Sequence, residues 1–185
     1  APDSRRETDL DINMCVNSVI NLLAGARDRR VDIGKDLCGD PATIRGDATQ
    51  IEQVTMNLCV NALQAMPDGG ELTISTDVVT AREEILVQNP DLEVGREYVR
   101  LKIRDTGIGM EQETLPQIFD PFFTTREDEG GSGLGLAISY RIVKRHRGSI
   151  SVESTPGLGT VFTVYFPASE ATVERQVDNE ETLQT

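Results

Sequence analysis

Hydrophobic residues recur at helical or strand spacing in successive blocks along the 185-residue chain. Apolar residues three or four apart predict helices over residues 10–24, 47–66 and 134–147. Alternating apolar and polar residues predict strands over residues 31–37, 71–79, 98–105, 148–153 and 159–166, with a shorter one at 43–45. This order of elements predicts a two-layer α/β sandwich, in which helices cover one face of a mixed sheet.

Polar residues at the ends of these blocks set the expected boundaries. Asp9 or Asp11 is placed to cap the first helix, and Asp47 to cap the long second helix. We expect residues 1–9 to be a frayed N-terminus or a linker, residues 10–167 to form one domain, and residues 168–185 to be a disordered acidic tail.

The stretch of residues 106–133 breaks the pattern, because it is rich in Gly and Pro and carries an acidic run at residues 127–129. A segment this long without regular structure inside a compact domain is typically a lid or a binding loop. We therefore expect the chemistry of the domain to gather here.

Composition narrows the classes of partner. The formal net charge of −13 argues against nucleic acid or an anionic membrane surface, because both require basic protein surface. No apolar run approaches the roughly 18 residues of a spanning helix. The three cysteines lack CxxC spacing, which favours reduced thiols in a cytoplasmic domain.

Two asparagines on the long helix are the first candidate site. Asn57 and Asn61 are four residues apart and share one helix face. A carboxamide oxygen is a hard, neutral ligand that suits Mg²⁺ beside phosphates. The alternative is that both amides are solvated or bonded within the helix.

The second candidate lies where a predicted strand ends, in Asp105-Thr106-Gly107-Ile108-Gly109. Gly107 and Gly109 allow positive φ angles and close approach of the backbone to a ligand. Asp105 is able to accept a hydrogen bond from an exocyclic amine such as that of adenine. An ordinary turn would have the same composition.

A second glycine-rich segment precedes the last predicted helix. Glycines before a helix N-terminus expose unpaired N–H groups to an anion. The pattern is neither GxxxxGK[ST] nor a dinucleotide-binding GxGxxG, and a plain capping loop is the alternative. The candidate phosphate-binding residues are Gly131, Ser132, Gly133, Leu134, Gly135 and Leu136.

The segment IFDPFFTTR, residues 118–126, brings three of the few aromatic residues into the loop. Apolar residues in a lid need a nucleotide or a partner to cover, or they form a small satellite core. Thr125 and Arg126 are placed to reach a phosphate.

These four segments resemble, in order, the N, G1, F and G2 boxes of the sensor histidine kinase catalytic domain. They read QIEQVTMNLCVNALQAM, DTGIGM, IFDPFFTTR and GSGLGLAISYRIVKRHRG. The resemblance spans residues 10–167, and the wording is similar to the nitrogen-regulation and oxygen-sensing subclass. It implies the ATP-binding α/β sandwich of the GHKL superfamily, also called the Bergerat fold, with a Gly-rich ATP lid.

The resemblance also implies roles for individual residues. Asn61 is expected to bind Mg²⁺ with Asn57 beside it, Asp105 to read the adenine amine, and the second glycine segment to flank the phosphates. One departure is Gln64, because many relatives carry a basic residue at this position, three residues after the metal-binding asparagine.

The single histidine, His146, does not match the phosphorylated histidine of this family, which lies on a separate helical hairpin. We expect His146 to cap a helix C-terminus. The chain is then a fragment or a subunit that binds ATP without phosphorylating itself. Its expected partners are its own histidine-bearing hairpin, in a homodimer, and a response regulator receiver domain, with no nucleic acid or direct membrane contact.

Two other functions fit this fold. GHKL ATPases such as gyrase B carry a Glu one turn before the metal asparagine, where this chain has Asn57, whose amide cannot activate water. A nucleotide-binding interaction module of the anti-sigma type, or a serine kinase of that kind, would need no histidine hairpin. The kinase remains our leading hypothesis.

Overall fold

The computed structural model describes residues 7–26, 30–124 and 132–170. In chain order its elements are β1 Thr8–Asp11, α1 Ile12–Ala26, β2 Val31–Leu37, β3 Thr43–Gly46, α2 Ala48–Gln64, β4 Gly70–Thr80, α3 Glu83–Leu86, β5 Glu97–Asp105, the 3-10 helix η1 Leu115–Gln117, α4 Gly135–Arg145, β6 Ser149–Thr155 and β7 Gly159–Pro167.

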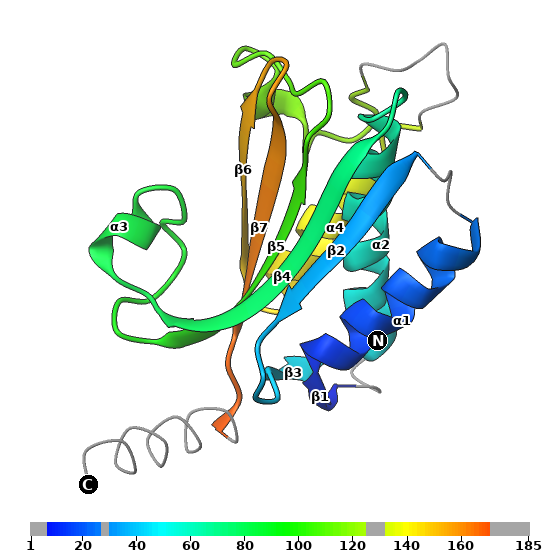
Figure 1. Cartoon of the computed structure of the whole chain (residues 1–185). Helices are drawn as coiled ribbons and strands as arrows, with labels where there is room; N and C mark the ends of the chain where they lie inside the picture. The colour runs from blue at the N-terminus through cyan, green and yellow to red at the C-terminus, as the bar shows by residue number, and fades with distance from the viewer. Residues whose placement is uncertain (1–6, 27–29, 125–131, 171–185) are drawn as a thin grey trace, which may run out of the picture.

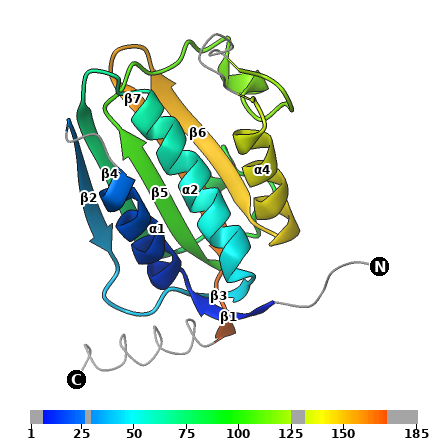
Figure 2. The same ribbon diagram turned by 90° about the vertical axis from the view of Figure 1, so that its right-hand side faces the viewer.

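Five strands form one sheet in the order β2-β4-β5-β7-β6 (Figure 1). The β2–β4 pair is parallel and the other three pairs are antiparallel, so the sheet is mixed. Helices α1, α2 and α4 lie side by side across one face (Figure 2). The predicted two-layer α/β sandwich is therefore confirmed.

Helix α2 runs through the centre of the helical layer because its sequence supplies both a cap and a buried stripe. The Asp47 carboxylate accepts hydrogen bonds from the N–H groups of Thr49 at 2.9 Å and Gln50 at 3.4 Å. Ile51, Val54, Leu58 and Ala62 recur on one face, and all are buried in the main core. This stripe anchors α2, whose opposite face is available for a site.

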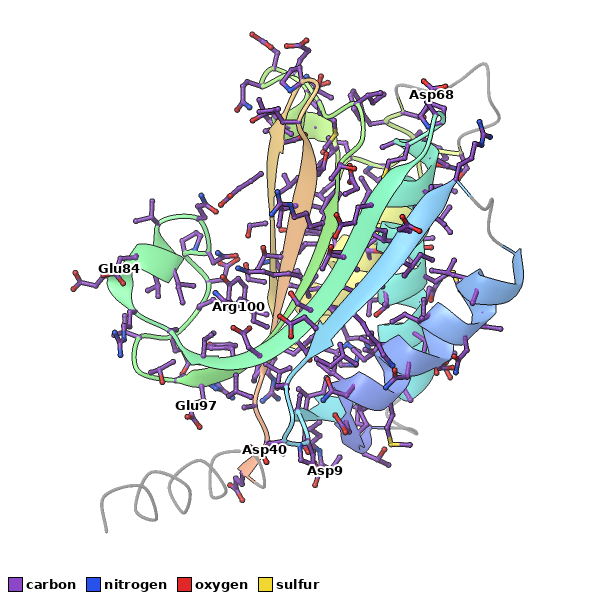
Figure 3. The ribbon with its side chains drawn as sticks, viewed as in Figure 1. Asp9, Asp40, Asp68, Glu84, Glu97 and Arg100 are labelled. Atoms are coloured by element: carbon purple, nitrogen blue, oxygen red, sulfur yellow. The ribbon has the colours of Figure 1, made fainter. Side chains whose placement is uncertain are left out.

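The core between the layers is largely aliphatic, as expected for a chain without tryptophan. The other face of the sheet carries a smaller buried cluster of Ala81, Leu92, Tyr98 and Tyr165 together with polar residues. There Arg100 of β5 pairs with Asp77 of β4 through two hydrogen bonds, one from Nε at 2.8 Å (Figure 3). The hydrogen bond to Asp77 raises the pKa of the Arg100 guanidinium above its ordinary value.

Strand β1 was not predicted, and the first helix begins at Ile12 instead of residue 10. Residues 8–11 pair with β3, a strand more than thirty residues away, so the local pattern carried no signal for it. Asp11 is the residue at the cap, because its Oδ1 accepts hydrogen bonds from the N–H groups of Asn13 at 3.0 Å and Ala42 at 3.1 Å.

The two ends of the chain are described only in part. Ala168 bridges Ile44, and the Ser169 N–H donates to the Thr43 carbonyl at 2.9 Å, so the sheet layer continues just past the predicted boundary at 167. The remainder of the expected tail, residues 171–185, and residues 1–6 lie outside the described residues. Among the helices described, none has the length and hydrophobicity of a membrane-spanning segment.

Candidate functional site

A cavity of about 360 Å³ opens where α2 and β5 end and α4 begins. This is the end of the molecule marked by Asp68, opposite the end marked by Asp9, Asp40 and Glu97 (Figure 3). Among the described residues it is lined by Asn57, Val60, Asn61, Gln64, Ala65, Asp105, Ile108, Gly109, Met110, Thr114, Ile118, Phe123, Thr124, Ser132, Gly133, Gly135, Leu136, Thr160 and Phe162. Parts of all four predicted motif segments therefore meet in one place.

The two asparagines of α2 both line this cavity, but their amides have different surroundings. Asn57 Nδ2 donates to the Gly135 carbonyl at 3.1 Å and lies 3.2 Å from Ser139 Oγ. These bonds tie α2 to the first two turns of α4. The Asn61 side chain makes no hydrogen bond with any described residue, so its amide is the one presented to the cavity.

Asp105 ends β5 and is buried, with 3% of its surface exposed. Its Oδ1 accepts a hydrogen bond from the Gly107 N–H at 2.8 Å, which fixes the carboxylate at the turn. The Ile108 N–H donates to the Ala65 carbonyl at 2.9 Å. A Cβ at Gly107 would lie 2.4 Å from that same carbonyl oxygen, so only glycine allows the loop to approach α2 this closely.

Gly109 is held from the other side. Its φ is +68°, and a Cβ there would lie 2.1 Å from the carbonyl oxygen of Thr155, the last residue of β6. The Gly157 N–H donates to the Ile108 carbonyl at 2.7 Å. We call residues 105–110 the first glycine loop, and it is wedged between the end of α2 and the β6–β7 turn.

The second glycine loop, residues 132–136, leads into α4. Gly133 has a φ of +63°, and a Cβ there would lie 2.5 Å from the Phe122 backbone. The Phe122 N–H donates to the Gly133 carbonyl at 2.9 Å, which holds these two backbone positions together. Leu134 occupies the N-cap of α4 without a side-chain capping bond, so the first-turn N–H groups lack that partner.

Some predicted residues cannot be placed. Thr125, Arg126 and Gly131 lie outside the described residues, so their roles stay predictions. Gly107 and Leu134 are described but do not line the cavity, whereas Ser132, Gly133, Gly135 and Leu136 do.

Sequence reasoning missed Thr160 and Phe162, which reach the cavity from β7. Both are buried, and Thr160 lies directly opposite Asp105 in the antiparallel β5–β7 pair. The sequence did carry a signal for Thr160. Inward-facing and outward-facing residues alternate along β7, which places Thr160 on the same face as Phe162 and the buried Val164. A polar residue heading an otherwise apolar inward row marks a wall of a site.

His146 lies at the far end of α4, with both ring nitrogens engaged. Nδ1 is 2.8 Å from the Ile142 carbonyl oxygen, and Nε2 accepts from the Asp47 N–H at 3.2 Å. A carbonyl only accepts and an N–H only donates, so these partners assign a neutral imidazole with its proton on Nδ1. His146 therefore joins the end of α4 to the start of α2, as expected of a structural histidine.

The donor set of the cavity limits how it would hold a metal. Among the described residues, no three His, Cys, Asp or Glu side chains come together as a metal site. Mg²⁺ is commonly held by one or two protein oxygens together with waters and substrate phosphates. The Asn61 amide beside a loop of backbone N–H groups fits that mode of binding.

Comparison with known proteins adds an independent finding. A family model described as "Histidine kinase-, DNA gyrase B-, and HSP90-like ATPase" matches residues 46–170. The "Sensor kinase CckA" of Brucella abortus is 37% identical over 168 residues, which cover 89% of this chain and 18% of that protein. "Sporulation kinase C" of Bacillus subtilis is 41% identical over 128 residues, which cover 69% of this chain and 26% of that protein.

Solved structures give the same picture. A nucleotide-free catalytic domain of histidine kinase ThkA is 28% identical, with a TM-score of 0.71. The match covers 88% of this chain and 96% of that one. The chain thus corresponds in extent to that single domain, and it spans 18% and 26% of the two curated relatives.

Proposed function

This chain belongs to the family of histidine kinase-, DNA gyrase B- and HSP90-like ATPases, and on that premise we propose that its cavity binds ATP with Mg²⁺. The domain then donates the γ-phosphate to a histidine on a separate dimerisation hairpin. The observation that carries the proposal is one cavity lined by the buried Asp105, the Asn61 amide and the second glycine loop.

The part of the site that binds the adenine ring lies around Asp105. One carboxylate oxygen accepts the Gly107 N–H, and an ionised carboxylate retains further acceptor positions for an exocyclic amine. Ile108, Met110 and Phe162 supply apolar walls nearby, which suit a flat heterocycle.

The phosphate end relies on neutral donors and the metal. No Lys or Arg is among the described residues that line the cavity, and Gln64 occupies the position where many relatives have a basic residue. The Asn61 oxygen is the protein ligand for Mg²⁺, and the N–H groups at the start of α4 face the phosphates. Bound Mg²⁺ neutralises phosphate charge, and Arg126 is the proposed cation from the lid.

Transfer to an outside histidine fits this site better than hydrolysis. Asp105 is the one carboxylate among the described lining residues, and we assign it to recognition of the adenine ring of ATP. The Asn57 amide is occupied by α4 and has no basic lone pair with which to activate water. The sensor and sporulation kinases among the relatives favour the kinase over the ATPase and the interaction module.

The partners follow from the same proposal. The full-length protein forms a homodimer through the hairpin and passes the phosphate to a response regulator receiver domain in the cytoplasm. The chain by itself does not autophosphorylate, because both ring nitrogens of its single histidine are engaged.

Calorimetric titration with ATP and Mg²⁺ tests the site. Asp105→Asn places amide N–H groups against the adenine amine, and we expect affinity to fall at least about tenfold, as a lost charged hydrogen bond implies. Asp68→Asn is the matched control, because it removes the same charge from an exposed residue at the same end of the molecule. Equal ATP affinities of the parent and Asp105→Asn would overturn the adenine assignment.

The metal arm of this titration uses Asn61→Ala. Mg²⁺ should tighten ATP binding to the parent chain and have little effect on the variant. If Mg²⁺ tightened binding equally in both, Asn61 would not be the metal ligand.

A further inference from the structure

Ser154 of β6 is buried, with 7% of its surface exposed. It has no part in the ATP binding or phosphate transfer proposed above. It is the second-to-last residue of β6 and pairs with Thr160 of β7. Thr160 in turn pairs with Asp105 of β5. A row of three residues therefore crosses the sheet from Ser154 through Thr160 to the carboxylate of the cavity.

The Ser154 hydroxyl contacts both the first glycine loop and strand β7. Its Oγ accepts the Met110 N–H at 2.9 Å, which holds the end of the first glycine loop. The same oxygen lies 3.1 Å from the Gly159 carbonyl and 2.8 Å from Thr160 Oγ1. The Ser154 carbonyl also accepts from Gln112 Nε2 at 2.8 Å.

Proton counting shows what this arrangement does. Ser154 has one hydroxyl proton for two acceptors, the Gly159 carbonyl and Thr160 Oγ1. The Gly159 carbonyl has no proton to give, so its contact with Ser154 Oγ is made by the Ser154 proton. Thr160 then donates its own proton to Ser154 Oγ and presents only lone pairs to the cavity. Ser154 therefore fixes Thr160 as a hydrogen-bond acceptor toward the cavity, which suits an amine.

Resting on the proposed nucleotide site, we propose that Ser154 is a positioning residue for base recognition. It holds the Thr160 hydroxyl beside the Asp105 carboxylate and fastens the first glycine loop to the β6–β7 turn. The site then distinguishes a 6-amino purine from a 6-oxo purine. Without Ser154, Thr160 rotates freely and serves as donor or acceptor, and this discrimination weakens.

The test compares ATP with inosine triphosphate, which carries an oxo group in place of the amine. Both are titrated with Mg²⁺ against the parent, Ser154→Ala and Ser151→Ala. Ser151 lies on the opposite face of the same strand and is the matched control. Loss of one positioning hydrogen bond should lower ATP affinity about threefold to tenfold in Ser154→Ala. Inosine triphosphate affinity should change less than about twofold, so the ratio falls.

Each result is decisive. A ratio of affinities that is unchanged in Ser154→Ala overturns the proposal, whether both affinities are retained or both fall equally. A parent that does not bind ATP overturns the proposed function itself, and the role of Ser154 with it. A parent that binds ATP and loses discrimination only in Ser154→Ala supports both.

A second variant covers the case in which Ser154→Ala does not fold. Gln112 is exposed, and its amide bond to the Ser154 carbonyl can be removed without opening the core. We expect Gln112→Ala to lower ATP affinity roughly twofold to threefold, because the loop is less firmly fastened. Unchanged ATP affinity in Gln112→Ala would then overturn the proposal.

Discussion

The two glycine loops approach the same cavity, but a Cβ added at their glycines would contact different neighbours. In the first loop, Gly107 and Gly109 press against the backbone oxygens of Ala65 and Thr155, at 2.4 and 2.1 Å from where a Cβ would be. In the second loop, a Cβ at Gly135 would meet only the Asn57 side chain, at an ordinary 3.8 Å. The fold itself requires glycine in the first loop, but at Gly135 it does not.

That difference separates glycines that the fold requires from glycines that ligand binding requires. Where the protein's own backbone excludes a Cβ, substitution should cost stability. Where the space is open only toward a cavity, substitution should cost binding. Gly133 belongs with the first group, because the Phe122 backbone excludes its Cβ.

The largest effect is expected for Gly109→Ala. The residue would carry a Cβ at φ +68° and collide with the Thr155 carbonyl, so the free energy of unfolding should fall by about 2 to 4 kcal/mol. Urea denaturation measures this. Gly157→Ala is the control, because Gly157 has φ +77° but no heavy atom within 4 Å of its Cβ. Equal losses in the two variants would show that the collision is not what matters.

Gly135→Ala tests the opposite case, a glycine that the fold does not require. The free energy of unfolding should change by less than about 1 kcal/mol, since alanine favours the helix that begins here. ATP affinity should fall about fivefold or more, because a methyl group would then stand between the backbone and the phosphates. Titration and denaturation of the same preparation check both parts. Undiminished ATP affinity would mean that the phosphates do not approach Gly135.

The smallest effect concerns α2, on which both loops rest. Burial raises the pKa of the Cys59 thiol on α2 to about 12, and burial also raises that of Cys15 on α1 to about 11. Unfolded thiols titrate near 8.5. Their contribution to stability is therefore complete below that pH, and it is lost as the pH rises toward 11 and 12.

Denaturation between pH 8 and pH 10.5 measures this loss. Above pH 9 we expect the free energy of unfolding to fall with pH, on the order of 1 kcal/mol per unit for Cys59. Cys59→Ala should lessen the slope, whereas Cys38→Ala, at a half-buried position, is the control. An equal slope in the parent and Cys59→Ala would remove Cys59 as the cause.

Local sequence signals were sufficient wherever the physics is local. The stripe from Ile51 to Ala62 and the Asp47 cap define α2, and four-residue spacing places Asn57 and Asn61 on one face. These features depend on neighbours within a few turns of the same chain.

Features that depend on distant partners were not predictable in this way. Strand β1 exists because β3 pairs with it, and the Asn57 amide is occupied because α4 starts beside it. Thr160 faces the cavity because β7 pairs with β5. Each outcome is decided by a partner more than thirty residues away, which no window of sequence contains.

The central claim is that this domain holds ATP for an outside histidine, and transfer in trans tests it most directly. The chain is mixed with the separately prepared histidine-bearing hairpin of the full-length kinase, labelled ATP and Mg²⁺, beside Asp105→Asn as the variant with weakened ATP binding. The account predicts acid-labile phosphate on the hairpin, much less with the variant, and none on this chain alone. Acid-labile phosphate on this chain by itself, or none on the hairpin although ATP binds, would contradict it.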